Sequence, residues 1–213
     1  MGQIIEITVV LLIFFFACLL CRYIYKRAAA IRKIKTLKTV SRVKIKKIRS
    51  PFASYFTLSD NPDFIIEIGR RVYLIRFLNG KGTHRFMHFA SPKFFVTYSK
   101  MRFSVGNLTS LRGRYAVTKS SGFLTTGAHS VKILPPLTIP DEYIRATEIY
   151  GKLIEPVLIL SPAPNEVSYV AENKTSIKVA FTGDEIYGHK VFTASSFVSY
   201  AERVYREDKI YTR

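Results

Sequence analysis

Two carboxylates and two histidines have spacings that occur in metal-binding sites. Asp63 and Glu67 are four residues apart, as are His84 and His88. On a helix this spacing places both side chains on one face, which would suit a shared metal ion, whereas on a strand it separates them by about 13 Å. Both stretches have the composition of β-strands, so neither pair is expected to hold a metal. No metal site and no cofactor are predicted.

Other motifs with a chemical meaning are incomplete. The segment from Asn79 to Thr83, NGKGT, lacks the spacing of a P-loop and the third glycine of a dinucleotide fingerprint. Its Asn-Gly pair instead predicts a hairpin turn, with a returning strand from His84 to Phe89. The sequence contains no G-x-S-x-G elbow. Both cysteines, Cys18 and Cys21, lie in an apolar stretch, so the remainder of the chain has no disulfide or thiolate zinc site.

One run of residues resembles a known hairpin. Pro62-Asp63-Phe64-Ile65-Ile66-Glu67, followed after a turn by Val72-Tyr73-Leu74-Ile75-Arg76-Phe77-Leu78, is similar to the hairpin of restriction-endonuclease-like folds, particularly nuclease-related (NERD-type) domains. In that family an Asp opens the first strand, and the second strand ends in Glu-x-Lys. The wider order of elements, from residue 28 to residue 206, is similar too.

The resemblance implies a degenerate nuclease site. Only Asp63 matches the metal-binding pattern, since the family's acid falls on Arg76 and its lysine on Leu78. Such nucleases need two or more carboxylates to hold a divalent ion, and a guanidinium repels that ion. No catalytic residue is therefore assigned. Asp63 and Glu67 are the candidates for any activity that survives.

The elements that must position these residues begin with an apolar segment. The fifteen residues from Ile7 to Cys21 carry no charge, and with their apolar flanks they predict one transmembrane helix from Ile4 to Tyr25. A cleaved signal peptide would need positive charge before its apolar core, but Glu6 is the only charged side chain there. A buried core helix would rarely place three consecutive phenylalanines and further leucines on all its faces.

A basic segment follows the apolar one. Between Arg22 and Arg49 there are twelve Lys and Arg residues and no acid, so the positive-inside rule predicts a single-pass protein of the cell membrane with its N-terminus outside. Such a flank is ordinary for this topology, but it also predicts binding to anionic headgroups, with nucleic acid as the second candidate partner. The residues assigned to lipid binding are Arg22, Lys26, Arg27, Arg32, Lys33, Lys35 and Lys38.

The predicted organisation is a membrane anchor over residues 1–27, a basic juxtamembrane helix and strand over 28–49, and a cytoplasmic domain over 50–213. That domain has 21 basic and 14 acidic residues, a net charge of +7, and it contains no acid between Glu67 and Asp141. Its fold class is expected to be mixed α/β with a β-rich middle. Helices are expected at Ala28–Val40, Asp141–Leu153 and Ser195–Arg206. Strands are expected at Phe64–Ile68, Arg71–Leu78, Lys93–Ser99, Met101–Val105, Arg114–Thr118, Val131–Leu134, Glu155–Leu160, Val167–Ala171 and Ile177–Phe181.

The sequence favours a non-catalytic, membrane-anchored domain with a basic surface for anionic lipid or another polyanion. The alternatives are a membrane-tethered, metal-dependent nuclease and a scaffolding subunit of a membrane complex. A nuclease requires a cluster of carboxylates near Asp63, whereas a scaffold requires binding to another protein that does not weaken with salt. The sequence does not identify a protein partner.

Overall fold

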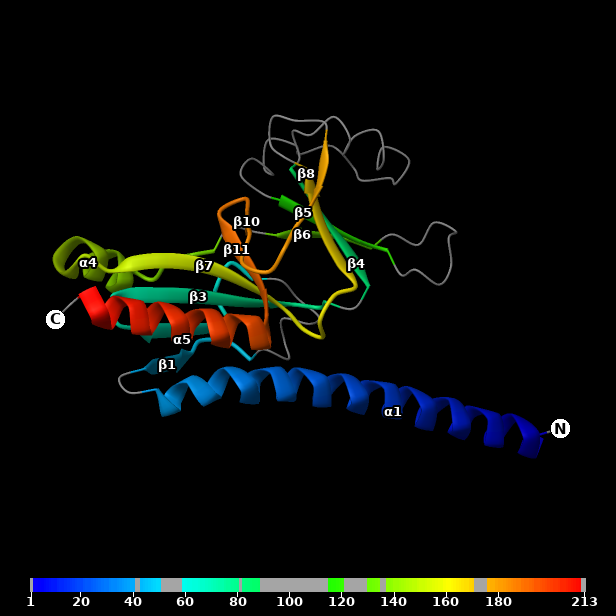
Figure 1. Ribbon diagram of the computed structural model, residues 1–213. Helices are drawn as coiled ribbons and strands as arrows, with labels where there is room; N and C mark the ends of the chain where they lie inside the picture. Colours follow the sequence, from blue (N-terminus) through cyan, green and yellow to red (C-terminus); the bar gives the residue numbers. More distant parts are fainter. Residues whose placement is uncertain are drawn as a thin grey trace.

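The computed structural model describes residues 2–40, 43–50, 59–80, 82–88, 115–120, 130–134, 137–170 and 176–211. Over these residues the chain is a mixed α/β protein, as expected, and a long N-terminal helix precedes two mixed sheets (Figure 1). The strands expected at Lys93–Ser99 and Met101–Val105 lie outside the described residues.

Helix α1 (Gly2–Lys35) is continuous and ends in a 3-10 turn, η1 (Thr36–Thr39). It joins the expected anchor and the expected juxtamembrane helix into one element. The described side chains from Ile5 to Lys26 are all exposed, so this segment is not a core helix, and it is long and apolar enough to span a membrane. The last turns are buried against the domain, through Ala30, Ile31, Ile34 and Leu37.

A six-stranded sheet, sheet A, lies at the centre of the domain with the strand order β1-β2-β3-β7-β11-β10. The first three strands are antiparallel, β3, β7 and β11 are parallel, and β10 is antiparallel to β11. The strands are β1 (Lys44–Lys47), β2 (Phe64–Ile68), β3 (Arg71–Leu78), β7 (Leu153–Leu160), β10 (Glu185–Ile186) and β11 (His189–Thr193). The predicted β2–β3 hairpin is confirmed.

Different elements cover the two faces of sheet A because its buried strands are apolar on both sides. Helices α1 and α5 (Ala194–Tyr211) pack on one face, against alternate residues such as Tyr73, Ile75 and Phe77. On the other face, α4 (Asp141–Tyr150) packs through Tyr143 against Val72 and Leu74. The rest of that second face, near the ends of β3 and β7, contacts the second sheet.

The second sheet, sheet B, has the strand order β6-β5-β4-β8-β9. It consists of β4 (Thr83–His88), β5 (Tyr115–Ser120), β6 (Ser130–Leu134), β8 (Glu166–Val170) and β9 (Ile177–Val179). Strand β4 was expected to return along β3 through a hairpin turn at Asn79-Gly80, and this prediction was wrong. Strand β4 instead pairs with β5 and β8.

Gly80 lies at the point where the chain leaves sheet A. A Cβ atom at this position would lie 1.9 Å from the carbonyl oxygen of Pro162, so the backbone passes directly against the segment after β7. The amide of Gly80 also donates to the carbonyl of Ser161 at 3.4 Å. The Asn-Gly pair therefore lies at a close crossing between two segments, where glycine is required because a Cβ atom would not fit.

Two helix predictions differ in accuracy. The helix expected from Asp141 to Leu153 ends at Tyr150, because Gly151 adopts a left-handed conformation with φ of 60° and caps it. Leu153 then opens β7. The final amphipathic helix is confirmed, with Phe197, Val198, Ala201 and Val204 buried as expected.

Candidate functional site

Asp63 and Arg76 are neighbours across the β2–β3 hairpin, and both are buried, with exposed fractions of 0% and 2%. The Oδ2 atom of Asp63 accepts a hydrogen bond from the amide of Phe77 at 2.8 Å. Nη2 of Arg76 donates to the carbonyl oxygens of Ser59 at 2.7 Å and Asp60 at 3.5 Å. Burial lowers the pKa of Arg76 to about 10, although the nearby Asp63 charge opposes this shift.

Glu67 belongs to a different cluster. Its Oε2 atom accepts a hydrogen bond from Nζ of Lys152 at 2.6 Å, and its Oε1 atom accepts one from the hydroxyl of Tyr143 at 3.1 Å. Burial opposes ionisation, but the hydrogen bond and charge of Lys152 outweigh it, so the pKa of Glu67 lies below its usual value. The two candidate carboxylates, Asp63 and Glu67, therefore do not converge on one site.

The described residues contain no group of three or more His, Cys, Asp or Glu side chains that could hold a metal ion. The guanidinium of Arg76 interacts electrostatically with Asp63, and its positive charge would repel a divalent cation there. His84 lies buried on β4. This arrangement can neutralise the charge of a buried carboxylate.

A third polar cluster surrounds Glu155 on β7. Its carboxylate accepts hydrogen bonds from Arg71, from Nζ of Lys190 at 2.7 Å and from the hydroxyl of Tyr200 at 3.2 Å. Burial would raise the pKa of Glu155, but the bonds from Lys190 and Arg71 outweigh burial and lower it. Because the partners come from β3, β11 and α5, this cluster ties the parallel strands to the final helix.

Six of the seven residues assigned to lipid binding are exposed on α1 or η1, namely Arg22, Lys26, Arg32, Lys33, Lys35 and Lys38. Arg27 is the exception, because its side chain is only 2% exposed. Its Nη1 atom donates to the carbonyl of Leu78 at 3.4 Å, and its guanidinium lies 4.8 Å from the ring centroid of Phe77. The assignment of Arg27 to lipid binding is corrected, since a buried side chain is not available to a headgroup.

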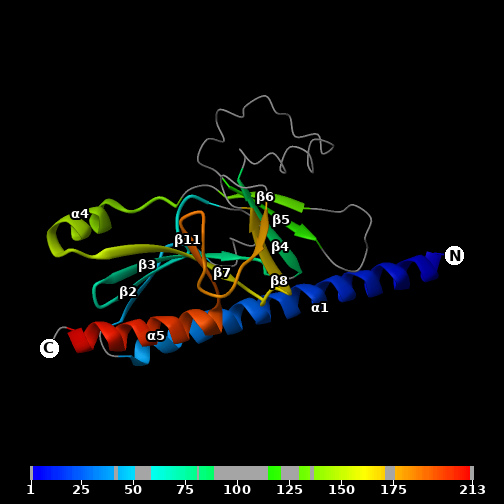
Figure 2. The same cartoon turned by 45° about the horizontal axis from the view of Figure 1, so that its top comes forward.

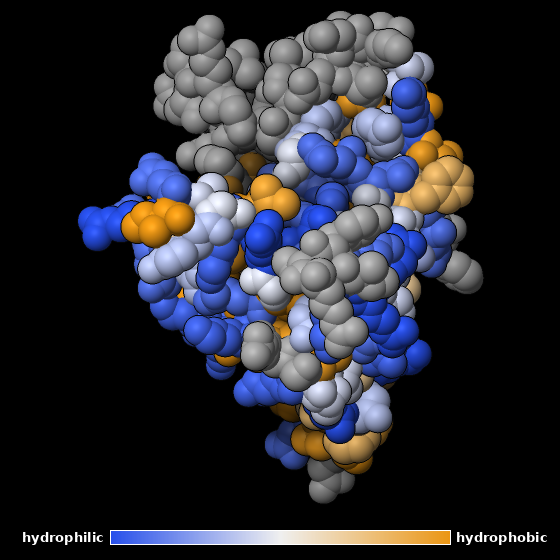
Figure 3. Space-filling view, turned by 60° about the vertical axis from the view of Figure 1, so that its left-hand side comes forward, coloured by the Kyte–Doolittle hydropathy of each residue, from blue (hydrophilic) through white to orange (hydrophobic). Residues whose placement is uncertain are grey.

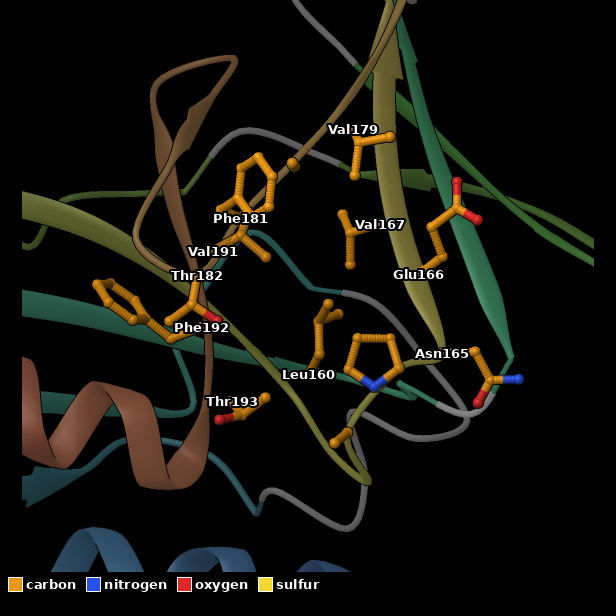
Figure 4. A pocket seen from close by; sticks show the side chains of 13 residues that line it. Leu160, Asn165, Glu166, Val167, Val179, Phe181, Thr182, Val191, Phe192 and Thr193 are labelled. Atoms are coloured by element: carbon orange, nitrogen blue, oxygen red, sulfur yellow. The ribbon is translucent and has the colours of Figure 1, made fainter.

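An apolar pocket lies between the two sheets, at the carboxyl ends of β7 and β11 (Figure 4). Its volume is about 250 Å³. In Figure 4, Leu160, Val167, Val179 and Phe181 surround one space, while Asn165 and Glu166 lie at its margin. The lining residues are Leu160, Ala163, Pro164, Asn165, Glu166, Val167, Val179, Ala180, Phe181, Thr182, Val191, Phe192 and Thr193.

The opposite end of the domain has a different surface. Figure 3 shows the side that bears α4, where the visible side chains are mostly hydrophilic and apolar ones are scattered. Ile149 and Tyr150 of α4 are exposed at 69% and 71%. Isolated apolar side chains of this kind are normal on a soluble surface and indicate no site.

Sequence reasoning missed Arg27 as a packing residue, the buried His189 at the start of β11, and the pocket. Arg27 falls three residues before Ala30 and seven before Ile34, so its place on the buried stripe was visible in the helical period. The pocket had no comparable signal. Its lining residues come from separated segments that meet only when sheet A and sheet B pack together.

The chain was compared with protein-family models, with curated proteins and with solved structures, and none of these comparisons finds a match. The chemistry of the chain must therefore be inferred from its own geometry.

Proposed function

We propose that the chain is a single-pass membrane protein with its N-terminus outside and a non-catalytic domain in the cytoplasm, where basic residues bind anionic phosphate groups. The observation that carries the proposal is the division of α1. The described side chains of its apolar part are exposed, whereas Ala30, Ile31, Ile34 and Leu37 of its last turns are packed into the domain. A bilayer provides the apolar surroundings that the first part lacks.

Along the axis of α1, the basic residues lie at increasing distances from the predicted membrane span. Arg22 and Lys38 are separated by about 24 Å along the axis, whereas charges interact over about 8–10 Å at physiological salt. Arg22 and Lys26 lie at the predicted boundary. Arg32 reaches back toward it, since its guanidinium lies 5.7 Å from the ring centroid of Tyr25. These three residues, the proximal set, are the ones proposed to bind lipid headgroups.

Lys33, Lys35 and Lys38 form a distal set that is exposed and lies about 12–20 Å of helical rise beyond Tyr25. A soluble polyanion, such as nucleic acid, is the second candidate ligand and would use this set. Binding of the full chain to DNA should then weaken steeply between low and physiological salt. Binding to a protein that does not respond to salt would favour the scaffolding function instead.

The topology can be tested with single cysteines in a C18S/C21S background. We expect Gln3→Cys to react with a membrane-impermeant maleimide in intact spheroplasts that express the chain. Tyr150→Cys, which is exposed on α4, should react only after permeabilisation. Labelling of Tyr150→Cys in intact spheroplasts would overturn the orientation. Recovery of the wild-type chain in the soluble fraction would overturn the membrane anchor.

The non-catalytic assignment is supported by the partners of Asp63 and Glu67, which belong to separate clusters. The order α1, β2–β3 hairpin, α4, β7 and α5 supports the proposed likeness to nuclease-related domains. We expect the purified full chain to leave DNA intact in the presence of Mg²⁺ or Mn²⁺. Cleavage that requires the metal and disappears in Asp63→Asn would show that the chain is a nuclease.

A further inference from the structure

The pocket between the two sheets opens to the surface beside an edge strand whose apolar residues are exposed. Strand β9 is the last strand of sheet B, and its apolar residues are exposed. The exposed fractions are 55% for Val179 and 74% for Phe181, and both residues also line the pocket. Large apolar side chains beside an apolar cavity on a sheet edge are a feature of binding surfaces.

The registers of sheet A place this pocket at the end of β3 that contacts α1, on the opposite face of the sheet. Leu160 is the partner of Leu78 on β3, and Thr193 is the partner of Leu160 on β11. Adjacent strands are about 4.8 Å apart, so the pocket floor lies one to two strands, or about 5–10 Å, from Leu78. Leu78 is the residue whose carbonyl oxygen accepts the hydrogen bond of Arg27.

Arg27 lies two residues, or about 3 Å of helical rise, after the predicted end of the membrane span at Tyr25. The pocket is therefore level with the boundary between headgroups and acyl chains when α1 crosses the bilayer. In Figures 1 and 2 the turn between β7 and β8 lies beside the middle of α1, on the side of Arg27 toward the predicted membrane span. The pocket and the anchor thus lie at the same end of sheet A.

We infer that the pocket binds one acyl chain of a lipid from the adjacent leaflet. This inference rests on the proposed membrane anchor, because it needs a bilayer next to Leu78. The cavity of about 250 Å³ is slightly smaller than the roughly 300–1,000 Å³ of typical ligand sites, so it suits a narrow hydrocarbon group. Its walls include Leu160, Val167 and Val191, which offer an alkyl chain apolar contact.

The polar margin favours a bilayer lipid over a free fatty acid. Glu166 is the one charged side chain among the described lining residues. The carboxylate of a free fatty acid at this margin would be repelled by Glu166. A bilayer lipid keeps its headgroup in the leaflet, where Arg22 and Lys26 are exposed, and inserts only its hydrocarbon.

The test uses the full chain in nanodiscs that contain phosphatidylcholine with a photoactivatable diazirine on its acyl chain. After irradiation, labelled peptides are mapped by mass spectrometry. We expect adducts in residues 5–20 and in the pocket segments, residues 160–167 and 179–193, with none in α4. Leu160 is only 1% exposed, so an adduct there requires a chain inside the pocket rather than contact with the surface of the bilayer.

The possible labelling patterns distinguish failure of the acyl-chain site from failure of the proposed membrane anchor. Adducts confined to residues 5–20 would overturn the acyl-chain site and leave the anchor intact. Adducts in neither region would overturn both. Adducts in the pocket segments without any in residues 5–20 would overturn the anchored geometry on which the inference depends.

Two variants probe the pocket directly. Ala180→Phe fills the cavity, and Val179→Lys places a charge at its exposed rim without disturbing the core. Each should reduce labelling of the pocket segments at least fivefold while labelling of residues 5–20 stays unchanged, which provides an internal control. If Ala180→Phe does not fold, Val179→Lys still tests the site. Pocket labelling that persists undiminished in a folded Val179→Lys variant would overturn the site.

Discussion

The Nη1 atom of Arg27 donates a hydrogen bond to the carbonyl oxygen of Leu78 at 3.4 Å, and this contact joins α1 to the last residue of β3. The same guanidinium stacks on Phe77, 4.8 Å from its ring centroid. The exposed apolar part of α1 therefore leads without a flexible linker into a segment packed on the sheet. Under the proposed anchoring, the direction of α1 determines which end of sheet A lies nearest to the bilayer.

Arg27 is expected to stabilise the fold rather than bind lipid. Arg27→Ala removes the contact with Phe77 and leaves a cavity beside the Leu78 carbonyl, so we expect a loss of about 2–4 kcal/mol in the free energy of unfolding. Urea unfolding of the full chain in detergent micelles, followed by circular dichroism, measures it. Arg32→Ala, at an exposed position of the same helix, should change stability by no more than about 0.5 kcal/mol. Equal losses in the two variants would contradict the packing role.

Selective lipid binding should depend on the proximal set and not on the distal set. Each basic residue near an anionic surface contributes about 1 kcal/mol, so the triple variant R22Q/K26Q/R32Q should lower the enrichment of anionic lipid several-fold. The measurement is the ratio of anionic to zwitterionic lipid that remains with the chain in polymer-solubilised native discs. The triple variant K33Q/K35Q/K38Q removes the same charge and should leave the ratio unchanged. Equal effects of the two variants would mean that α1 lies along the membrane surface.

Asp63 and Arg76 should be strongly coupled because both are buried beside each other. Asp63→Asn or Arg76→Met alone removes an opposite charge from beside a buried ionised side chain, and each should cost about 3–5 kcal/mol of stability. The double variant should cost less than the sum of the two, with a coupling energy of about 1–3 kcal/mol. A double-mutant cycle from urea unfolding measures this energy. Strict additivity would show that the two charges do not stabilise each other.

Stability should fall between neutral and mildly acidic pH because of His189. Burial lowers its pKa below 6.5, and the charge of Arg76 adds to this effect, whereas the carbonyl of Tyr187 and the carboxylate of Glu185 oppose it. The unfolded chain therefore binds the proton more readily, so stability is full above pH 6.5 and declines as the pH drops toward the lowered pKa. Thermal unfolding at pH 7.5 and pH 5.5 should show this decline. In His189→Gln the difference between the melting temperatures at the two pH values should be smaller. An unchanged difference would show that His189 does not cause the decline.

Gly80 should tolerate substitution less well than a glycine that only needs its left-handed conformation. Gly80→Ala forces a Cβ atom against the Pro162 carbonyl, with about 3 kcal/mol of destabilisation or more expected from overpacking. Gly151→Ala meets no atom within 4 Å and should cost only about 1 kcal/mol, through its φ of 60°. Melting temperatures of the two variants test the ranking. A milder effect at Gly80 would show that the crossing of the two segments can open.

The periodic elements of this chain were determined by the sequence alone. The nearly continuous apolar runs of β2 and β3, the apolar run Pro156–Leu160 in β7 and the helical period of α5 were sufficient, because such patterns report local geometry directly. The uncharged run in α1 likewise required no tertiary information. Short strands such as β10 and β11 lacked a signal of this strength, since two to five residues span too few alternations to identify a strand.

Only the tertiary structure decided which separated residues meet. Asn79-Gly80 has the local chemistry of a hairpin turn, but the chain crosses to another sheet there because β8 and β5 offer β4 its partners. Asp63 and Glu67 lie on one short stretch of sequence, yet Arg76 and Lys152 draw them into separate clusters. Contacts of this kind depend on strand order and sheet packing, which arise from burial of the whole apolar surface and leave little trace in local spacing.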